Sequence, residues 1–253
     1  PAASLGVMAE GEAVLKGLQS FHSLPCFNTY LRQSYYVDVF NKGATPLKWK
    51  TSVTNDWILV SKKSGETATE ERIEVSIDWA KVPAGERILG TLDIMSDRGE
   101  KETVYISVFN PTSPSLAEMD TLFVENNGYV AMDAASFHRK VENDDIKMIV
   151  IPNLGFENTA VQLGNPMAKA QRTAGRNTPR LEYDFYTFNA GSVTVYTYAL
   201  PVFPVNSERG TCFGIMIDDG LLKYASNNAK EYSGEWRENV YRNSTINAVT
   251  LNI

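Results

Sequence analysis

The sequence predicts an all-β fold: an immunoglobulin-like β-sandwich followed by a second, jelly-roll-like β-sandwich. Short runs rich in Val, Ile, Thr, Tyr and Phe recur along the 253 residues and are separated by Gly, Pro, Asn and Asp. This is the pattern of strands joined by turns, and long helical periods are almost absent. With 43% hydrophobic residues, the chain can form one large domain or two ordinary domains with proper cores.

The first 110 residues predict a short opening segment and one sandwich. Residues 1–34 are expected to be either an extended, packed N-terminal linker or a short helix, because Gly11 and Gly17 weaken a helical pattern at 8–21. Residues 35–110 carry evenly spaced strand signals at 36–40, 47–53, 57–60, 73–77, 90–95 and 104–109. This spacing is typical of a seven-stranded immunoglobulin-like sandwich. Three tryptophans in or beside these strands are expected to fill its core: Trp49, Trp57 and Trp79.

A linker and a second β-domain account for the rest. Residues 111–120 begin with two prolines and small polar residues, which is typical of a short, stiff boundary. Residues 121–253 are expected to form the second sandwich, truncated within its last strand. Its clearest feature is an antiparallel hairpin at 181–199, in which apolar and polar residues alternate on both sides of a turn at 189–191. The hairpin leads into a proline-bracketed loop at 200–204.

Charge and cysteine content exclude several classes of function. The formal net charge is −6 and no basic stripe occurs, which argues against nucleic-acid binding. No apolar run approaches the length of a membrane span. Cys26 and Cys212 are far apart, so two ordinary thiols are expected rather than a disulfide framework. No metal or cofactor is predicted, although paired acids on turns make calcium conceivable at 144–145 and 218–219.

No catalytic set is predicted for this chain. His22 and His138 stand in unrelated contexts, and no Gly-x-Ser-x-Gly nucleophile elbow occurs. Glu182 and Asp184 lie on the same side of their predicted strand, about 7 Å apart by strand rise. That separation would suit an inverting glycosidase pair, but a solvated polar face is the stronger interpretation.

Aromatic residues, at 11% of the chain, predict sugar binding better than catalysis, because sugar rings stack on Trp and Tyr. Trp236 lies in a polar, loop-like context and is the best candidate for an exposed platform. Arg180 or Arg237 could pair bidentately with a uronic acid carboxylate. Tyr196 and Tyr198 point outward just before the proline-bracketed loop. For Trp236 the alternative is packing beneath a loop, and for the tyrosines it is cross-strand packing.

The amino-acid sequence also resembles the C-terminal region of glycoside hydrolase family 115, the xylan α-1,2-glucuronidases. The resemblance rests on PRLEYDFYTFNAGSVTVYTYALPVFP at 179–204 and on six further segments in the family's order: LGVMAEG at 5–11, YVDVFNKG at 36–43, IDW at 77–79, VFNP at 108–111, NGYV at 127–130 and IPNLG at 151–155. The chain departs from the family at Phe156, which follows Gly155 where the family commonly carries Arg. It also departs at 133–136 and in the loop at 201–204.

The resemblance implies a non-catalytic role for this chain. The family's catalytic carboxylates lie in an upstream domain, so this chain alone is not expected to hydrolyse anything, whereas its parent would be an α-glucuronidase. The family further implies a homodimer formed through the second domain, the 198–204 loop near the parent's cleft, glucuronoxylan as the parent's partner, and a periplasmic or secreted location. The alternative is a free-standing carbohydrate-binding module for uronic-acid-bearing plant polysaccharide.

Overall fold

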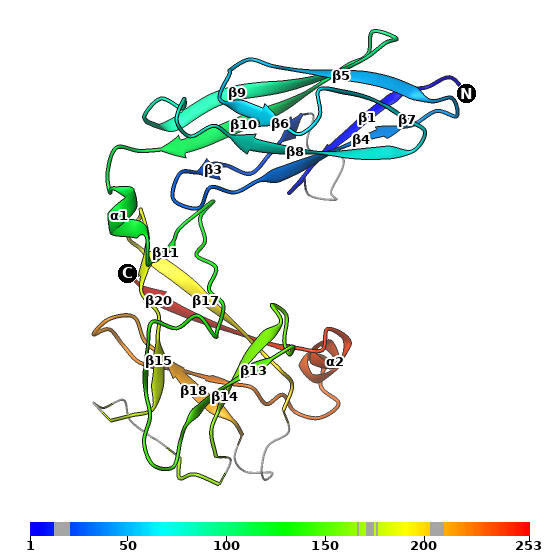
Figure 1. The fold of residues 1–253 in the computed structure, drawn as a ribbon. Coiled ribbons are helices and arrows are strands. Elements are labelled where there is room, and N and C mark those ends of the chain that lie inside the picture. The colour runs from blue at the N-terminus through cyan, green and yellow to red at the C-terminus, as the bar shows by residue number, and fades with distance from the viewer. Residues whose placement is uncertain (13–20, 166, 171–174, 176, 203–209) are drawn as a thin grey trace. The chain divides into compact units, whose positions relative to one another are not determined.

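The protein forms two compact units, residues 1–130 and residues 131–253. The computed structural model describes the whole chain except residues 13–20, 166, 171–174, 176 and 203–209. The described residues are nearly all strand, turn or loop, and their two helices are α1 (Leu116–Met119) and α2 (Gly234–Tyr241) (Figure 1). The all-β fold class predicted from the sequence is therefore confirmed.

The first unit is an immunoglobulin-like sandwich of two sheets. One sheet has the order β1-β4-β8-β6, and the other has the order β2-β10-β9-β5-β7 with β3 also paired to β10. Neighbouring strands are antiparallel, except that β2 and β3 run parallel to β10. The strands are β1 (Leu5–Ala9), β2 (His22–Ser23), β3 (Phe27–Asn28), β4 (Tyr35–Asn41), β5 (Leu47–Val53), β6 (Ile58–Val60), β7 (Ser64–Thr67), β8 (Glu70–Ile77), β9 (Gly85–Ser96) and β10 (Lys101–Asn110).

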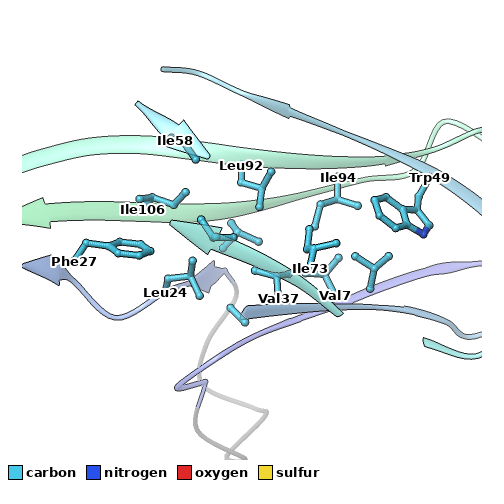
Figure 2. Close-up of a cluster of buried hydrophobic side chains, with 14 of the residues drawn as sticks. Val7, Leu24, Phe27, Val37, Trp49, Ile58, Ile73, Leu92, Ile94 and Ile106 are labelled. Atoms are coloured by element: carbon cyan, nitrogen blue, oxygen red, sulfur yellow. The ribbon is translucent and has the colours of Figure 1, made fainter. Parts of the chain in front are cut away.

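The core of this unit lies between its two sheets. Figure 2 shows Val37 and Ile73 from one sheet facing Leu92, Ile94 and Ile106 from the other, all of them fully or almost fully buried. Along β8, β9 and β10 these residues alternate with exposed or half-buried neighbours, which is the period that places every second side chain inward. Burying a side chain of this size contributes about 1.5–3 kcal/mol.

The three tryptophans of this unit lie where the sequence predicts. Trp49 and Trp57 are buried in the core, and Trp79 is partly buried and packed against it. The large rings therefore add to the hydrophobic area that the sheets remove from water.

The opening segment at 1–34 begins with a strand that the sequence did not predict. Leu5–Ala9 forms β1, which pairs with β4 along its whole length. Leu5 and Val7 are buried, and the Glu100 carboxylate accepts hydrogen bonds from the Leu5 N–H and the Ser4 hydroxyl, both at 2.9 Å. Residues 5–9 are held as a strand by pairing with β4 and by the burial of four of the five residues, and residues 13–20 of the helical pattern at 8–21 lie outside the described residues.

The expected linker at 111–120 is packed onto the first unit. The Tyr30 hydroxyl donates to the Pro114 carbonyl oxygen at 2.6 Å, and the Asn28 side-chain amide donates to the Glu125 carbonyl oxygen at 3.0 Å. Helix α1 lies in this stretch and strand β11 (Phe123–Val124) follows it, with Met119 and Val124 buried. These contacts explain why the first unit extends to Val130 rather than ending near residue 110.

The second unit is also built of strands, most of them in antiparallel two-stranded ladders: β12–β15, β13–β14, β17–β20 and β18–β19. Its strands are β12 (Arg139–Val141), β13 (Met148–Pro152), β14 (Thr159–Leu163), β15 (Arg180–Glu182), β16 (Phe185–Tyr186), β17 (Ser192–Ala199), β18 (Cys212–Ile215), β19 (Lys223–Ser226) and β20 (Thr245–Asn252).

The predicted hairpin at 181–199 contains strands as expected, but its pairing is different. β17 pairs with β20 over eight residues, from Ser192↔Asn252 to Ala199↔Thr245, while β15 pairs with β12. The alternation of β17 matches the alternation of β20, whose Thr245, Val249 and Leu251 are buried. Strand β15 is only three residues long, so β20 offers β17 a longer matching partner.

Candidate functional site

Four charged side chains gather where β12 pairs with β15, and we call them the charged cluster: Arg139, Arg180, Glu182 and Asp184. Arg139 lies opposite Glu182 in the ladder. Its Nε donates to Glu182 at 2.7 Å, and its two terminal nitrogens each donate to an Asp184 oxygen at 2.6 Å. Arg180 Nε donates to the other Glu182 oxygen at 2.6 Å. The planar guanidinium of Arg139 thus bridges both carboxylates.

This geometry settles the charge state of the two acids. Hydrogen bonds from Arg139 lower the pKa of Asp184, and hydrogen bonds from Arg139 and Arg180 lower the pKa of Glu182. A glycosidase needs one carboxyl group with a raised pKa to protonate the leaving group. Glu182 and Asp184 are both held ionised, and Arg139 bonds to each of them. They do not form the pair that hydrolysis requires.

The residues around the charged cluster have structural hydrogen bonds. The Asp184 backbone N–H donates to His138 Nδ1 at 3.0 Å, and the Tyr183 hydroxyl donates to the Ala134 carbonyl oxygen at 2.7 Å. Burial raises the pKa of Tyr183 to about 12, so this phenol stays protonated near neutral pH. In the first unit, His22 Nδ1 lies 2.7 Å from Glu12. Neither histidine is placed by these bonds as the base of a nucleophilic triad.

Metal and thiol chemistry receive no support within the described residues. No group of three or more His, Cys, Asp or Glu side chains that could hold a metal ion occurs in the part of the chain that the structure describes. Cys26 and Cys212 are both free, and burial raises the pKa of the Cys26 thiol. Among the described helices, none is long and apolar enough to cross a membrane.

Trp236 lies on helix α2 rather than in the loop that its polar neighbours suggested. The Ser233 hydroxyl accepts a hydrogen bond from the Trp236 N–H at 3.1 Å and caps the helix. The Trp236 side chain is half-buried and Arg237 beside it is exposed. The ring of Tyr232 packs against Trp236 with 5.3 Å between ring centroids and 54° between ring planes.

Tyr196 and Tyr198 project from the outer face of β17, as their alternation predicts. They are 60% and 66% exposed. Across the ladder they face Ala248 and Ile246, so a small side chain lies beside the Tyr196 ring. The loop that follows is described as far as Val202, and its residues Phe203 and Pro204 lie outside the described residues.

The predicted sugar-binding residues therefore fall into three separate places. Arg180 belongs to the charged cluster on β15, whereas Trp236 and Arg237 lie on α2, at the opposite side of the second unit in Figure 1. Tyr196 and Tyr198 occupy a third surface on β17. Sequence reasoning missed two residues, Arg139 and Tyr232. Arg139 can be placed only once the strand register is known. For Tyr232 a signal was available, because a Ser three positions before Trp236 is typical of a helix start.

The β13–β14 hairpin presents apolar side chains to solvent. Its turn contains three residues in the left-handed backbone region, Asn153, Gly155 and Asn158, and is closed by the Asn153 N–H donating to the Asn158 carbonyl oxygen at 2.7 Å. Between them Phe156 is 93% exposed. Adjacent strand residues Ile149 and Val150 are exposed as well, although they point to opposite faces of the ladder.

Comparison with known proteins identifies the second half of the chain. Residues 122–253 match the family model described as the glycosyl hydrolase family 115 C-terminal domain. No curated protein matches the chain.

Several solved structures resemble the fold. A Bacteroides ovatus GH5 xyloglucanase in complex with a XXXG heptasaccharide is 14% identical, with a TM-score of 0.33, over 49% of this chain and 22% of that chain. The periplasmic chaperone SfaE is 5% identical, with a TM-score of 0.33, over 48% of this chain and 65% of that one. The E. coli chaperone DraB is 10% identical, with a TM-score of 0.32, over 45% and 58%. The chain covers less than two thirds of each of these proteins.

Proposed function

Because this chain belongs to glycosyl hydrolase family 115, with residues 122–253 matching that family's C-terminal domain, we propose that it is the assembly region of a xylan-degrading α-glucuronidase. The chain is a non-catalytic region of a glycoside hydrolase. On this proposal, removal of glucuronic acid side chains from glucuronoxylan belongs to an upstream domain of the parent enzyme, which is secreted or periplasmic. Two copies of the chain associate through the second unit.

The observation that carries the assembly proposal is the distribution of apolar side chains in the second unit. Among the described residues of 131–253, the buried hydrophobic residues are Met148, Val249 and Leu251. Large apolar side chains of the same unit remain in water, with Phe156 the most exposed. Exposed apolar surface of this kind typically marks an interaction site.

A second copy of the chain is the proposed occupant of the β13–β14 hairpin. A two-fold interface buries the same patch on both subunits, so one exposed apolar hairpin supplies both sides of the contact. The left-handed residues of its turn fix the backbone beside Phe156 before association, which lowers the ordering cost of binding. A stable interface of this type needs about 1,200–2,000 Å² of buried surface in total, so neighbouring strands of the second unit contribute to it as well.

Light scattering of the 253-residue chain tests the assembly proposal. We expect a dimer at tens of micromolar protein, and a monomer for Phe156→Asp, because the change places a charge in the apolar contact. Leu89→Asp is the matched control, since Leu89 is an exposed apolar residue of β9 in the first unit, and it should remain dimeric. A strictly monomeric wild-type chain would refute the proposal.

Carbohydrate binding is the second candidate function, and the exposed aromatic residues of the second unit favour it. Tyr196 and Tyr198 are exposed and Trp236 is half-buried, and Arg237 beside it could pair with a uronic acid carboxylate. Isothermal titration with glucuronoxylan oligosaccharides, with hydrolysis products monitored in parallel, tests this function. Binding without products supports it, and unchanged affinity in Trp236→Ala and in the Tyr196→Ala/Tyr198→Ala double variant rules it out for these residues.

A further inference from the structure

We propose that Tyr232 and Trp236 form a preorganised aromatic platform that binds a neutral pyranose chain, with Tyr232 as the stacking surface and Trp236 as its support. The proposal goes beyond the role of Trp236 alone, because Tyr232 is the more exposed of the two residues. It rests on the proposed function only in the choice of xylan as the ligand. The geometry itself comes from the loop before α2 and from the first turn of that helix.

The backbone of Tyr232 is the first argument. Its φ is +62°, in the left-handed region, which is unfavourable for a bulky non-glycine residue. Such strain persists only when the surrounding structure imposes it, and it is concentrated at functional sites. The strained residue is nevertheless not buried, since 69% of Tyr232 is exposed. The conformation therefore holds a large aromatic ring in water.

The support of the ring is the second argument. The backbone of Trp236 is fixed by the helix cap, because its main-chain N–H donates to the Ser233 hydroxyl. The Ser233 N–H in turn donates to the Lys230 carbonyl oxygen at 2.9 Å, which closes the turn that contains Tyr232. On the backbone held by these bonds, the two rings contact each other with 5.3 Å between centroids. A preorganised surface loses little conformational entropy when a sugar stacks on it.

A purely structural role explains less of this geometry. A hydrophobic residue before a helix cap can pack on the helix as a staple, but its usual partner is the fourth helical residue, which here is Arg237. Tyr232 instead contacts Trp236, the third helical residue. A staple requires neither a left-handed residue nor a ring left mainly in water. The platform accounts for both features.

The charges around the platform select the class of sugar. The exposed ionisable residues nearest in sequence are two bases and three acids, giving a net charge of −1: Lys230, Arg237, Glu231, Glu235 and Glu238. This balance gives no net attraction for a uronate. Stacking on an aromatic ring depends on the apolar face of the sugar and not on charge. The expected ligand is therefore the neutral xylose backbone.

Tryptophan fluorescence during titration with xylohexaose tests the proposal directly. Trp49 and Trp57 are buried in the core of the first unit, and Trp79 packs against that core. A saturable change in emission should therefore come from Trp236 and should disappear in Trp236→Phe. Tyr232→Phe should retain affinity because the ring remains. Tyr232→Asn should weaken binding about tenfold, the loss expected for one aromatic contact.

The variants are chosen so that misfolding cannot imitate a loss of binding. Asn is the non-glycine residue best tolerated in the left-handed region, so Tyr232→Asn removes the ring while keeping the turn, and its thermal midpoint should match the wild type. Tyr241→Ala is the matched control, since Tyr241 is 83% exposed at the other end of α2, and it should bind normally.

Two results would overturn the platform: no saturable emission change in the wild-type chain, or unchanged affinity in Tyr232→Asn. Light scattering on the same samples separates this proposal from the assembly proposal. A dimer that does not bind xylohexaose refutes the platform alone, whereas a monomer that binds it refutes assembly alone.

Discussion

The two units of this chain are both built of antiparallel strands, yet they bury their apolar residues very differently. In the first unit a continuous core runs from Ala3 to Val108 between two sheets. In the described part of the second unit, short ladders surround a much smaller set of buried hydrophobic residues, and many of its large apolar side chains are exposed. The first unit is therefore stabilised by its own packing, and the exposed apolar residues of the second unit are the basis of the proposals that it binds a partner or a ligand.

Removing one core side chain from each unit should show the largest difference between them. Phe27→Ala deletes a fully buried ring in the first unit and should destabilise that unit by about 3–5 kcal/mol. Met148→Ala in the second unit should cost about 2 kcal/mol, the low end for such truncations, because the smaller core around it can relax more easily.

Urea unfolding of both variants measures this difference. Amide hydrogen exchange at each urea concentration, resolved by mass spectrometry into peptides of residues 1–130 and of residues 131–253, reports on the two units separately. An equal cost for the two substitutions would contradict the idea that the second unit has the weaker core.

A substitution in strand β1 should cause the next largest loss of stability. It tests whether the opening segment belongs to the core of the first unit. A Cβ atom at Gly6 would lie 2.2 Å from Cε2 of Phe40, so Gly6→Ala must displace that ring. We expect a loss of about 1–3 kcal/mol in the first unit, measured by thermal unfolding. Gly234→Ala in α2 is the control, since its Cβ meets nothing within 4 Å, and it should leave stability unchanged or slightly raised.

The charged cluster should give the second unit a stability that depends on pH. The pKa values of Glu182 and Asp184 are lowered in the folded state from 4.5 and 3.8. Their stabilising effect is therefore fully present above those unfolded values and is lost as the pH falls through the lower folded values. The stability of the second unit, followed by hydrogen exchange of its own peptides, should be flat near neutrality and should fall below about pH 4.5.

Arg139→Met tests the origin of that pH dependence. The variant removes the cation that both carboxylates share, so the folded pKa values should rise and the acid-side loss should become shallower. High salt should reduce the difference from the wild type, because the cluster is partly exposed. Arg237→Met is the matched control and should retain the wild-type slope. A slope unaffected by Arg139→Met would show that other carboxylates govern the acid response.

The sequence predicted the fold class and most strands of the first unit because period-two alternation depends only on neighbouring residues. It did not predict the partner of β17, because the alternation is the same whichever strand completes the ladder. Strand β1 was missed because five residues give a weak signal beside a longer, interrupted helical pattern. Short, local signals of this kind are outweighed by tertiary pairing.

The candidate sites were harder to predict for the same physical reason. Trp236 was identified from its residue type, but its helix was missed even though Ser233 was a readable cap. The left-handed backbone of Tyr232 is imposed by its surroundings, so it cannot be predicted from the residue type. Arg180 was assigned to sugar binding, a role that remains a prediction, because its pairing with Glu182 depends on how β12 and β15 come together.

Phe156→Asp should have only a small effect on folding, and this separates an assembly surface from a core. Its side chain is 93% exposed, whereas Phe27 is fully buried, so replacing it should change the free energy of unfolding of the monomer by no more than about 0.5 kcal/mol. Urea unfolding at low protein concentration measures that value, and repetition at high concentration should reveal a larger stability of the wild type alone, because association stabilises only the folded state. A large loss at low concentration would mean that Phe156 supports the fold of the second unit itself. The two units would then differ in where their core residues lie, and not in whether they bind a partner.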